Sequence, residues 1–100
     1  MIKHIVMWTL HDSAEGATKA ENIKLIKQSL SALIGKIPGL LHLEVGENFA
    51  DSPAAADLVL YSELESREAL AVYQQHPDHV AVAQFIGSVT ASRQVVDYDC

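Results

Sequence analysis

Cysteine is almost missing from this sequence: the single Cys100 is its last residue, so no internal disulfide bond can form. This usage is typical of a reducing compartment, and we expect a cytoplasmic protein. Basic residues are also few, since seven Lys and Arg stand against 13 Asp and Glu, for a net charge of −6. An acidic surface repels phosphate backbones, so we expect no nucleic acid among its partners.

Long apolar runs are absent as well. No stretch approaches the roughly 18–20 residues that a membrane-spanning helix needs. The apolar start, residues 1–8, lacks the basic region and the cleavage site of a signal peptide. We therefore expect no membrane association. With 49% apolar and 20% charged residues in 100, the composition predicts one globular domain over residues 1–100.

Several motifs of known chemistry are missing too. The sequence has no GxGxxG, Walker loop, GxSxG, CxxC or HExxH motif, and we expect no cofactor. What is present is an apolar pattern that changes its period along the chain. It predicts strands over residues 2–10, 41–49, 57–64 and 93–99, and helices over 18–37, 66–75 and from 77 onward. Residues 10–17 and 48–55 are predicted loops.

Local signals support the predicted ends of the helices. Thr18 and Glu21 have the spacing of a capping box, and Pro38-Gly39 is expected to stop the first helix. Pro77 disfavours helical geometry in the residue before it, which predicts a break at His76.

The resulting order, β-α-β-β-α-β, predicts an α+β, ferredoxin-like domain with an antiparallel four-stranded sheet and helices on one face. The first and third strands carry apolar residues on both faces, yet the chain offers no second cover. We therefore expect a homodimer, with several of Ile2, Val6, Trp8, Leu58 and Leu60 exposed on the uncovered face.

Five histidines are the most informative residues. His76 and His79, with Asp78 between them, could share a face and bind a metal, but ordinary helix-start contacts are the preferred interpretation and we expect no metal. Tyr73 and His79 flank the break and could face one cavity, with His79 as a general base and Tyr73 polarising a carbonyl. The alternative is a core Tyr73 and a solvated His79. Asp97, on the last strand, is expected to be a surface charge.

Six segments along the chain carry a family resemblance: residues 2–6, 37–40, 43–46, 57–60, 73–79 and 95–98. Together they resemble the stress-responsive α/β-barrel domain (Dabb) family, and the Tyr-x-x-His-Pro-x-His block at 73–79 is the most specific part. The resemblance implies a dimeric α+β barrel, in which two ferredoxin-like protomers pack sheet against sheet.

The resemblance also implies site residues. A plant cyclase of the family closes a linear polyketide by aldol condensation, and its catalytic His and Tyr correspond to His79 and Tyr73. Its strand-one His corresponds to His4, whereas a further pocket His is replaced here by Leu58. The expected pocket-lining residues are His4, Trp8, Leu58 and Phe85.

Three functions stay open at this point. The chain could bind a small organic ligand between sheet and helices without turnover, or act as a cyclase- or isomerase-like enzyme. It could also be a structural dimer module that associates with other proteins. The fold alone selects none of them.

Overall fold

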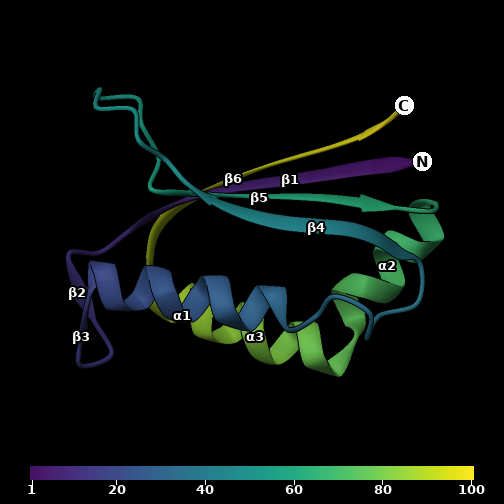
Figure 1. Ribbon diagram of the computed structural model, residues 1–100, viewed down its shortest axis with the longest axis horizontal. Helices are drawn as coiled ribbons and strands as arrows, with labels where there is room; N and C mark the ends of the chain where they lie inside the picture. The colour runs from purple at the N-terminus through teal and green to yellow at the C-terminus, as the bar shows by residue number, and fades with distance from the viewer.

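The computed structural model describes all residues from 1 to 100, and three helices cover one side of a four-stranded antiparallel sheet (Figure 1). The strand order is β4-β5-β1-β6. The strands are β1 (Ile2–Leu10), β4 (Leu40–Glu47), β5 (Leu58–Leu64) and β6 (Thr90–Asp99), and the helices are α1 (Lys19–Ser31), α2 (Arg67–Gln75) and α3 (Pro77–Val89). The predicted ferredoxin-like arrangement is confirmed, with its second helical region divided in two.

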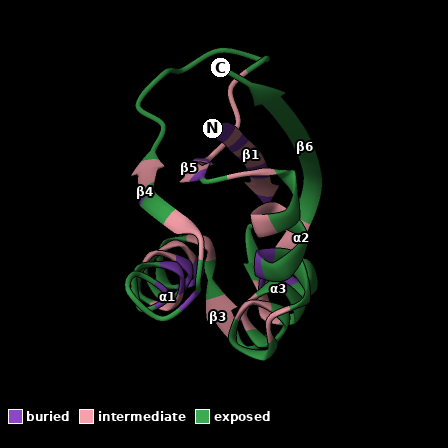
Figure 2. Ribbon diagram, turned by 90° about the vertical axis from the view of Figure 1, so that its right-hand side faces the viewer, coloured by how far each residue is buried: buried purple, intermediate pink, exposed green.

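The two central strands bury every second side chain, because successive side chains of a strand point to opposite faces. The buried set is Ile2, His4, Val6, Trp8 and Leu10 on β1, and Leu58, Leu60, Ser62 and Leu64 on β5. These residues pack against the apolar sides of the helices, including Ile26, Leu30 and Ile86. The core therefore lies between the sheet and the helix layer, and edge strand β6 is exposed along almost its whole length (Figure 2).

No helix covers the opposite face of the sheet, and only the loop between β4 and β5 borders it at one end. We call this surface the outer face; its apolar and aromatic residues are Ile5, Met7, Val59, Tyr61, Val96 and Tyr98. An uncovered apolar face was predicted, but the expected residues were wrong. Ile2, Val6, Trp8, Leu58 and Leu60 are all buried under the helices, because the more apolar side of each central strand faces the helix layer.

Helix α1 begins at the predicted capping box. The Thr18 hydroxyl accepts the Glu21 backbone N–H at 3.2 Å, and the Glu21 carboxylate accepts the Thr18 N–H at 3.0 Å. The helix ends at Ser31, earlier than expected. Beyond it the chain forms tighter turns, and Gly35 adopts a φ of 80°, which a right-handed helix cannot contain.

The predicted loop after β1 contains a short hairpin, in which β2 (Ser13–Ala14) pairs with β3 (Ala17–Thr18). Its turn residues Glu15 and Gly16 have φ values of 52° and 74°, the geometry of a two-residue type I′ turn. Strands of two residues are too short to show a period-two pattern, so the sequence does not reveal them.

Helices α2 and α3 separate at His76, as predicted. His76 is extended, with φ −63° and ψ 132°, the conformation that a following proline favours. Its Nδ1 accepts the N–H of Asp78 at 3.1 Å and so caps α3, while Ser66 caps α2 by accepting the N–H of Ala69 at 3.1 Å. None of the three helices is long and apolar enough to span a membrane.

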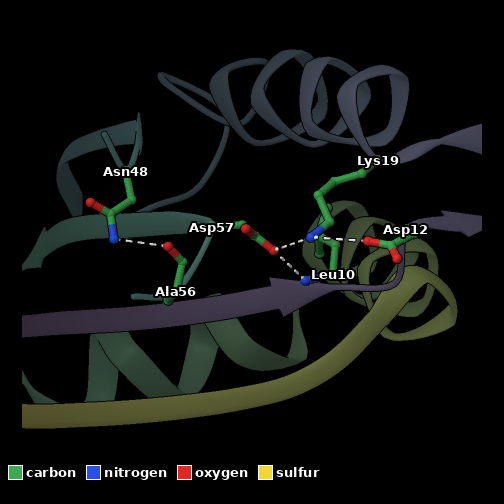
Figure 3. Close-up of polar contacts among 6 residues, drawn as sticks. All are labelled: Leu10, Asp12, Lys19, Asn48, Ala56 and Asp57. Atoms are coloured by element: carbon green, nitrogen blue, oxygen red, sulfur yellow. Dashed lines mark hydrogen bonds and ion pairs between the residues drawn. The ribbon is translucent and has the colours of Figure 1, made fainter. Parts of the chain in front are cut away.

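Asp57, just before β5, holds the end of β1 against the start of α1 (Figure 3). Its carboxylate accepts the N–H of Leu10 at 2.8 Å and lies 3.2 Å from Nζ of Lys19, which also lies 3.6 Å from Asp12. The Asp57 N–H donates to the Trp8 carbonyl at 2.8 Å. These contacts fix the end of β1, where its pairing with β6 shifts register.

The β4–β5 loop (residues 48–57) extends from the sheet on the side opposite the helices (Figure 1). At its base the Asn48 side chain donates to the Ala56 carbonyl at 2.8 Å (Figure 3). The predicted strand through Phe49 is too long, because β4 ends at Glu47 and Phe49 is fully exposed. A register shift between Leu40 and His42 turns Leu41 out of the alternating pattern.

Candidate functional site

Three rings meet between the sheet and the helices, and we call them the ring cluster: His4 of β1, Tyr73 of α2 and His79 of α3. The Tyr73 and His79 ring centroids are 4.2 Å apart with an interplanar angle of 43°. His4 meets Tyr73 edge-on at 5.9 Å. Residues six positions apart on a continuous helix point to different sides, so the Tyr73–His79 contact depends on the extended residue His76.

His79 is half buried, and its hydrogen bond sets the state of the ring. Its Nδ1 lies 3.3 Å from the Gln74 carbonyl oxygen, which can only accept. Nδ1 therefore carries the hydrogen, and Nε2 of the neutral ring has the free lone pair. Burial lowers the pKa of His79 below its usual 6.5; the Gln74 bond opposes this shift, while His4, Arg93 and His76 add to it. The imidazole is neutral at pH 7.

His4 is buried and held from both neighbouring strands. Asp97 lies opposite it on β6, and His4 Nδ1 donates to the Asp97 carboxylate. Ser62 lies opposite it on β5 and donates its hydroxyl to the His4 carbonyl at 2.9 Å. Asp97 is an exposed charge on an edge strand, as expected, and its bond to His4 is a further role that was not predicted. The strand register, which one sequence does not reveal, makes Asp97 the residue that orients His4.

The Tyr73 hydroxyl is buried and makes no hydrogen bond within the protein. Burial raises the pKa of Tyr73 to about 12, so the hydroxyl keeps its proton. A buried hydroxyl without a partner costs roughly 1–3 kcal/mol, and most buried polar groups are paired. Tyr73 and His79 touch through their rings, and no hydrogen bond joins them.

A cavity of about 120 Å³ lies beside the ring cluster, between the sheet and α3. We call it the inner cavity; its lining residues are His4, Val6, Trp8, Leu30, Leu60, His79, Ala83, Ile86, Gly87, Thr90 and Arg93. Exposed Ala83, Gly87 and Arg93 place its mouth between α3 and β6. An apolar cavity of about 150 Å³ admits benzene, so the somewhat smaller inner cavity limits the body of a ligand to at most about one six-membered ring.

A larger cavity, of about 740 Å³, lies on the outer face beneath the β4–β5 loop. It contains none of the histidines or tyrosines, and we take the inner cavity as the candidate site on chemical grounds. Of the four residues predicted to line a pocket, His4 and Trp8 line the inner cavity. Leu58 lines the larger one, and half-buried Phe85 packs against the core and lines neither.

His76 and His79 have different hydrogen-bond partners at the break between α2 and α3. Nδ1 of His76 caps α3, and Nδ1 of His79 donates to the Gln74 carbonyl. No three His, Cys, Asp or Glu side chains come close enough together to hold a metal ion. His42, on the outer face, lies 3.0 Å from Glu44.

Sequence reasoning missed two contributors to the site, Arg93 and the Gln74 carbonyl. The alternation of β6 does put Arg93, Val95 and Asp97 on one face of the strand. Only the pairing of Trp8 with Arg93 and of His4 with Asp97 shows that this face adjoins the ring cluster. A backbone carbonyl leaves no signal in a sequence.

The fold and the site define a class: a ferredoxin-like α+β domain with a histidine-lined cavity between its sheet and its helices, next to a buried tyrosine. Within that class the chain belongs to the stress responsive A/B barrel domain (Dabb) family, whose model matches residues 2–100.

Similar proteins agree with this membership. The uncharacterized protein SCO4036 of Streptomyces coelicolor is 32% identical over 81 residues, which cover 81% of each chain. A dimeric ferredoxin-like protein of unknown function from Bacteroides fragilis is 31% identical, with a TM-score of 0.85 over 99% of this chain and 95% of that one. A Dabb family protein from Mesorhizobium loti is 25% identical, with a TM-score of 0.77 over 99% and 95%.

Proposed function

We propose that this protein binds a small organic molecule in the inner cavity and does so as a homodimer. The observation that carries the proposal is the buried, unpartnered Tyr73 hydroxyl within the ring cluster; Tyr73 lies behind His4 and His79, the two members of the cluster that line the cavity. A protein retains such a destabilising group where it serves a function, and a ligand oxygen reaching the hydroxyl would give it a partner. Apolar walls with a few convergent polar groups are typical of small-molecule sites.

A thermal-shift screen of ring-sized organic compounds tests the binding proposal. A compound at 100 times its Kd stabilises the folded state by about 2.7 kcal/mol, a shift that is easily measured in a domain of this size. We expect hits whose shift is lost when the cavity is filled by Ala83→Leu. The matched control, Ala81→Leu, changes an exposed residue of the same helix outside the cavity. Hits that survive Ala83→Leu unchanged would place binding elsewhere.

Homodimerisation through the outer face is supported by two features of the chain. The outer face carries apolar residues on three adjacent strands, and fully exposed Phe49 of the β4–β5 loop lines the outer-face cavity together with Met7 and Val59. Pairing two such faces would bury on the order of 1,200 Å² or more, as stable interfaces do. The similar protein from Bacteroides fragilis is described as dimeric.

A second candidate function is enzymatic, and the state of His79 favours it. Neutral at pH 7, with Nδ1–H directed to Gln74, the ring offers Nε2 as a general base. It would take a proton from the carbon next to a ligand carbonyl, while the C–H electron pair forms an enolate. The Tyr73 hydroxyl, which keeps its proton, would donate to the enolate oxygen. This is the first step of a cyclase- or isomerase-like reaction.

Deuterium exchange separates the enzyme from the plain binding protein. A ring-sized ketone such as cyclohexanone is incubated with the protein in D2O, and its α-hydrogens are followed by NMR. The enzymatic candidate requires exchange faster than in buffer, lost in His79→Gln while binding persists. Exchange at the buffer rate, with binding intact, leaves the binding function alone.

A further inference from the structure

Of the two arginines, Arg67 is in an ion pair with Asp99, whereas the guanidinium of Arg93 makes no hydrogen bond or ion pair within the protein. Its place is fixed by the register of β6 on β1, which sets it directly opposite Trp8. Trp8 faces the helices, and both residues line the inner cavity. Arg93 is exposed on the edge strand, so it stands at the mouth of the inner cavity with its donors free, and it also borders the larger cavity of the outer face.

The carboxylates that could neutralise Arg93 from its own strand are already engaged. Asp97 accepts from His4, and Asp99 binds Arg67 at 2.6 Å. The cavity lining contains no Asp or Glu. The one titratable residue of α3 that lines the cavity with it is His79, which is neutral at pH 7. The mouth therefore carries one uncompensated positive charge in a protein of net charge −6.

Other unpaired cations of the chain lack this setting. Lys24 and Lys36 are exposed and do not line the inner cavity, and Lys3 lies 5.9 Å from the Tyr61 ring on the other side of the sheet. Lys19, Lys27 and Arg67 are in ion pairs. Arg93 is therefore the only Lys or Arg of the chain that lines the inner cavity and has no ion-pair partner.

We propose that Arg93 is an anion subsite, and that the ligand is a small carboxylic acid with an apolar body no larger than about one six-membered ring. The body occupies the inner cavity and the carboxylate lies at the mouth, where the planar guanidinium can bind it through two parallel N–H···O bonds. A single guanidinium matches a monoanion. The proposal rests on the proposed binding function and names the chemical class of the ligand.

Benzoate and benzamide form the test pair, because they have nearly the same shape and differ in charge. Their affinities are measured by isothermal titration calorimetry on the purified protein. We expect benzoate to bind at least about tenfold more tightly than benzamide, the order that a charge-assisted hydrogen bond contributes. In Arg93→Gln this preference should vanish, because the affinity for benzoate falls to that for benzamide.

Two further variants make the result specific. Arg67→Gln removes an arginine whose side chain is 80% exposed and does not line the cavity, and it should keep the preference. Arg93→Lys keeps the charge but loses the fork, and it should retain only part of the preference. Equal binding of benzoate and benzamide to the unchanged protein overturns the anion subsite and leaves the cavity function standing. Binding of neither compound contradicts both proposals.

Discussion

The Tyr73 hydroxyl lowers the stability of the folded protein, but it has a role in the proposed ligand binding. The hydroxyl is buried without a partner, which destabilises the folded protein, yet it is the group that a bound ligand oxygen would use. We expect Tyr73→Phe to raise the free energy of unfolding by about 1 kcal/mol, since it removes an unpaired polar group and keeps the ring. Urea denaturation of the unliganded protein measures this change.

Tyr61 provides the matched control for that substitution. Its hydroxyl donates to Glu63 at 2.6 Å, so Tyr61→Phe removes a satisfied group and should leave stability unchanged or slightly reduced. A Tyr73→Phe protein less stable than the unchanged one would mean that the hydroxyl has a partner in solution.

His79 should make stability depend on pH in a defined direction. Its pKa in the folded protein lies below the unfolded value of 6.5, so the unfolded chain binds the proton more readily. Its contribution is constant above pH 6.5, and stability falls as the pH drops from 6.5 through the folded pKa. Thermal unfolding from pH 7.5 to 5 should show a steeper loss for the unchanged protein than for His79→Gln. Parallel curves would place a solvated imidazole at this position.

At the scale of elements, the turn between α1 and β4 is fixed by one glycine. Gly39 has a φ of 83°, and a Cβ there would lie 2.6 Å from the Ala69 Cβ on α2. Gly39→Ala therefore combines backbone strain with a clash against a helix. We expect a loss of about 2 kcal/mol or more in the free energy of unfolding, measured by chemical denaturation.

The same substitution at Gly87 should have the opposite sign. Gly87 lies in α3, and a Cβ there meets no atom within 4 Å. Because alanine favours a helix over glycine by roughly 0.5–1 kcal/mol, Gly87→Ala should stabilise the protein. Equal losses at the two positions would contradict the assigned role of Gly39.

The elements that the sequence predicts well are those with local causes. The capping box at Thr18, the break before Pro77 and the alternation of β1 all depend on residues close together in the chain. The end of α1 and the hairpin around Gly16 were missed, because short turns leave no periodic pattern. The proximity of Tyr73 and His79 could also be predicted from the sequence, because it depends on the break at Pro77 that lies between them. The His4–Asp97 bond and the place of Arg93 could not, since they depend on how β1 and β6 align.

At the scale of the whole molecule, the sheet separates the candidate ligand site from the proposed dimer contact. The inner cavity lies on its helix side, and the proposed dimer contact lies on its outer face. A change on one face should therefore leave the other intact, because β1 points alternate side chains to the two sides.

Val59 is the residue through which we would test the dimer. It lies on the central strand β5 opposite Met7, on the outer face near the β4–β5 loop. A carboxylate there would be buried without a partner in the paired sheets, so Val59→Asp should give a monomer of about half the mass by light scattering. Val72→Asp, at an exposed position of α2, should stay dimeric. A monomeric unchanged protein would contradict the proposal.

The wall of the inner cavity includes the only tryptophan of the chain, Trp8, which is 4% exposed. Nearly all the fluorescence excited at 295 nm therefore comes from one indole, and this indole sits on the helix side of the sheet. A molecule entering the cavity would change its emission directly, whereas association through the outer face would leave it almost unaltered. The protein thus carries an optical probe at its candidate site, and one titration without any label can distinguish a ligand from a partner.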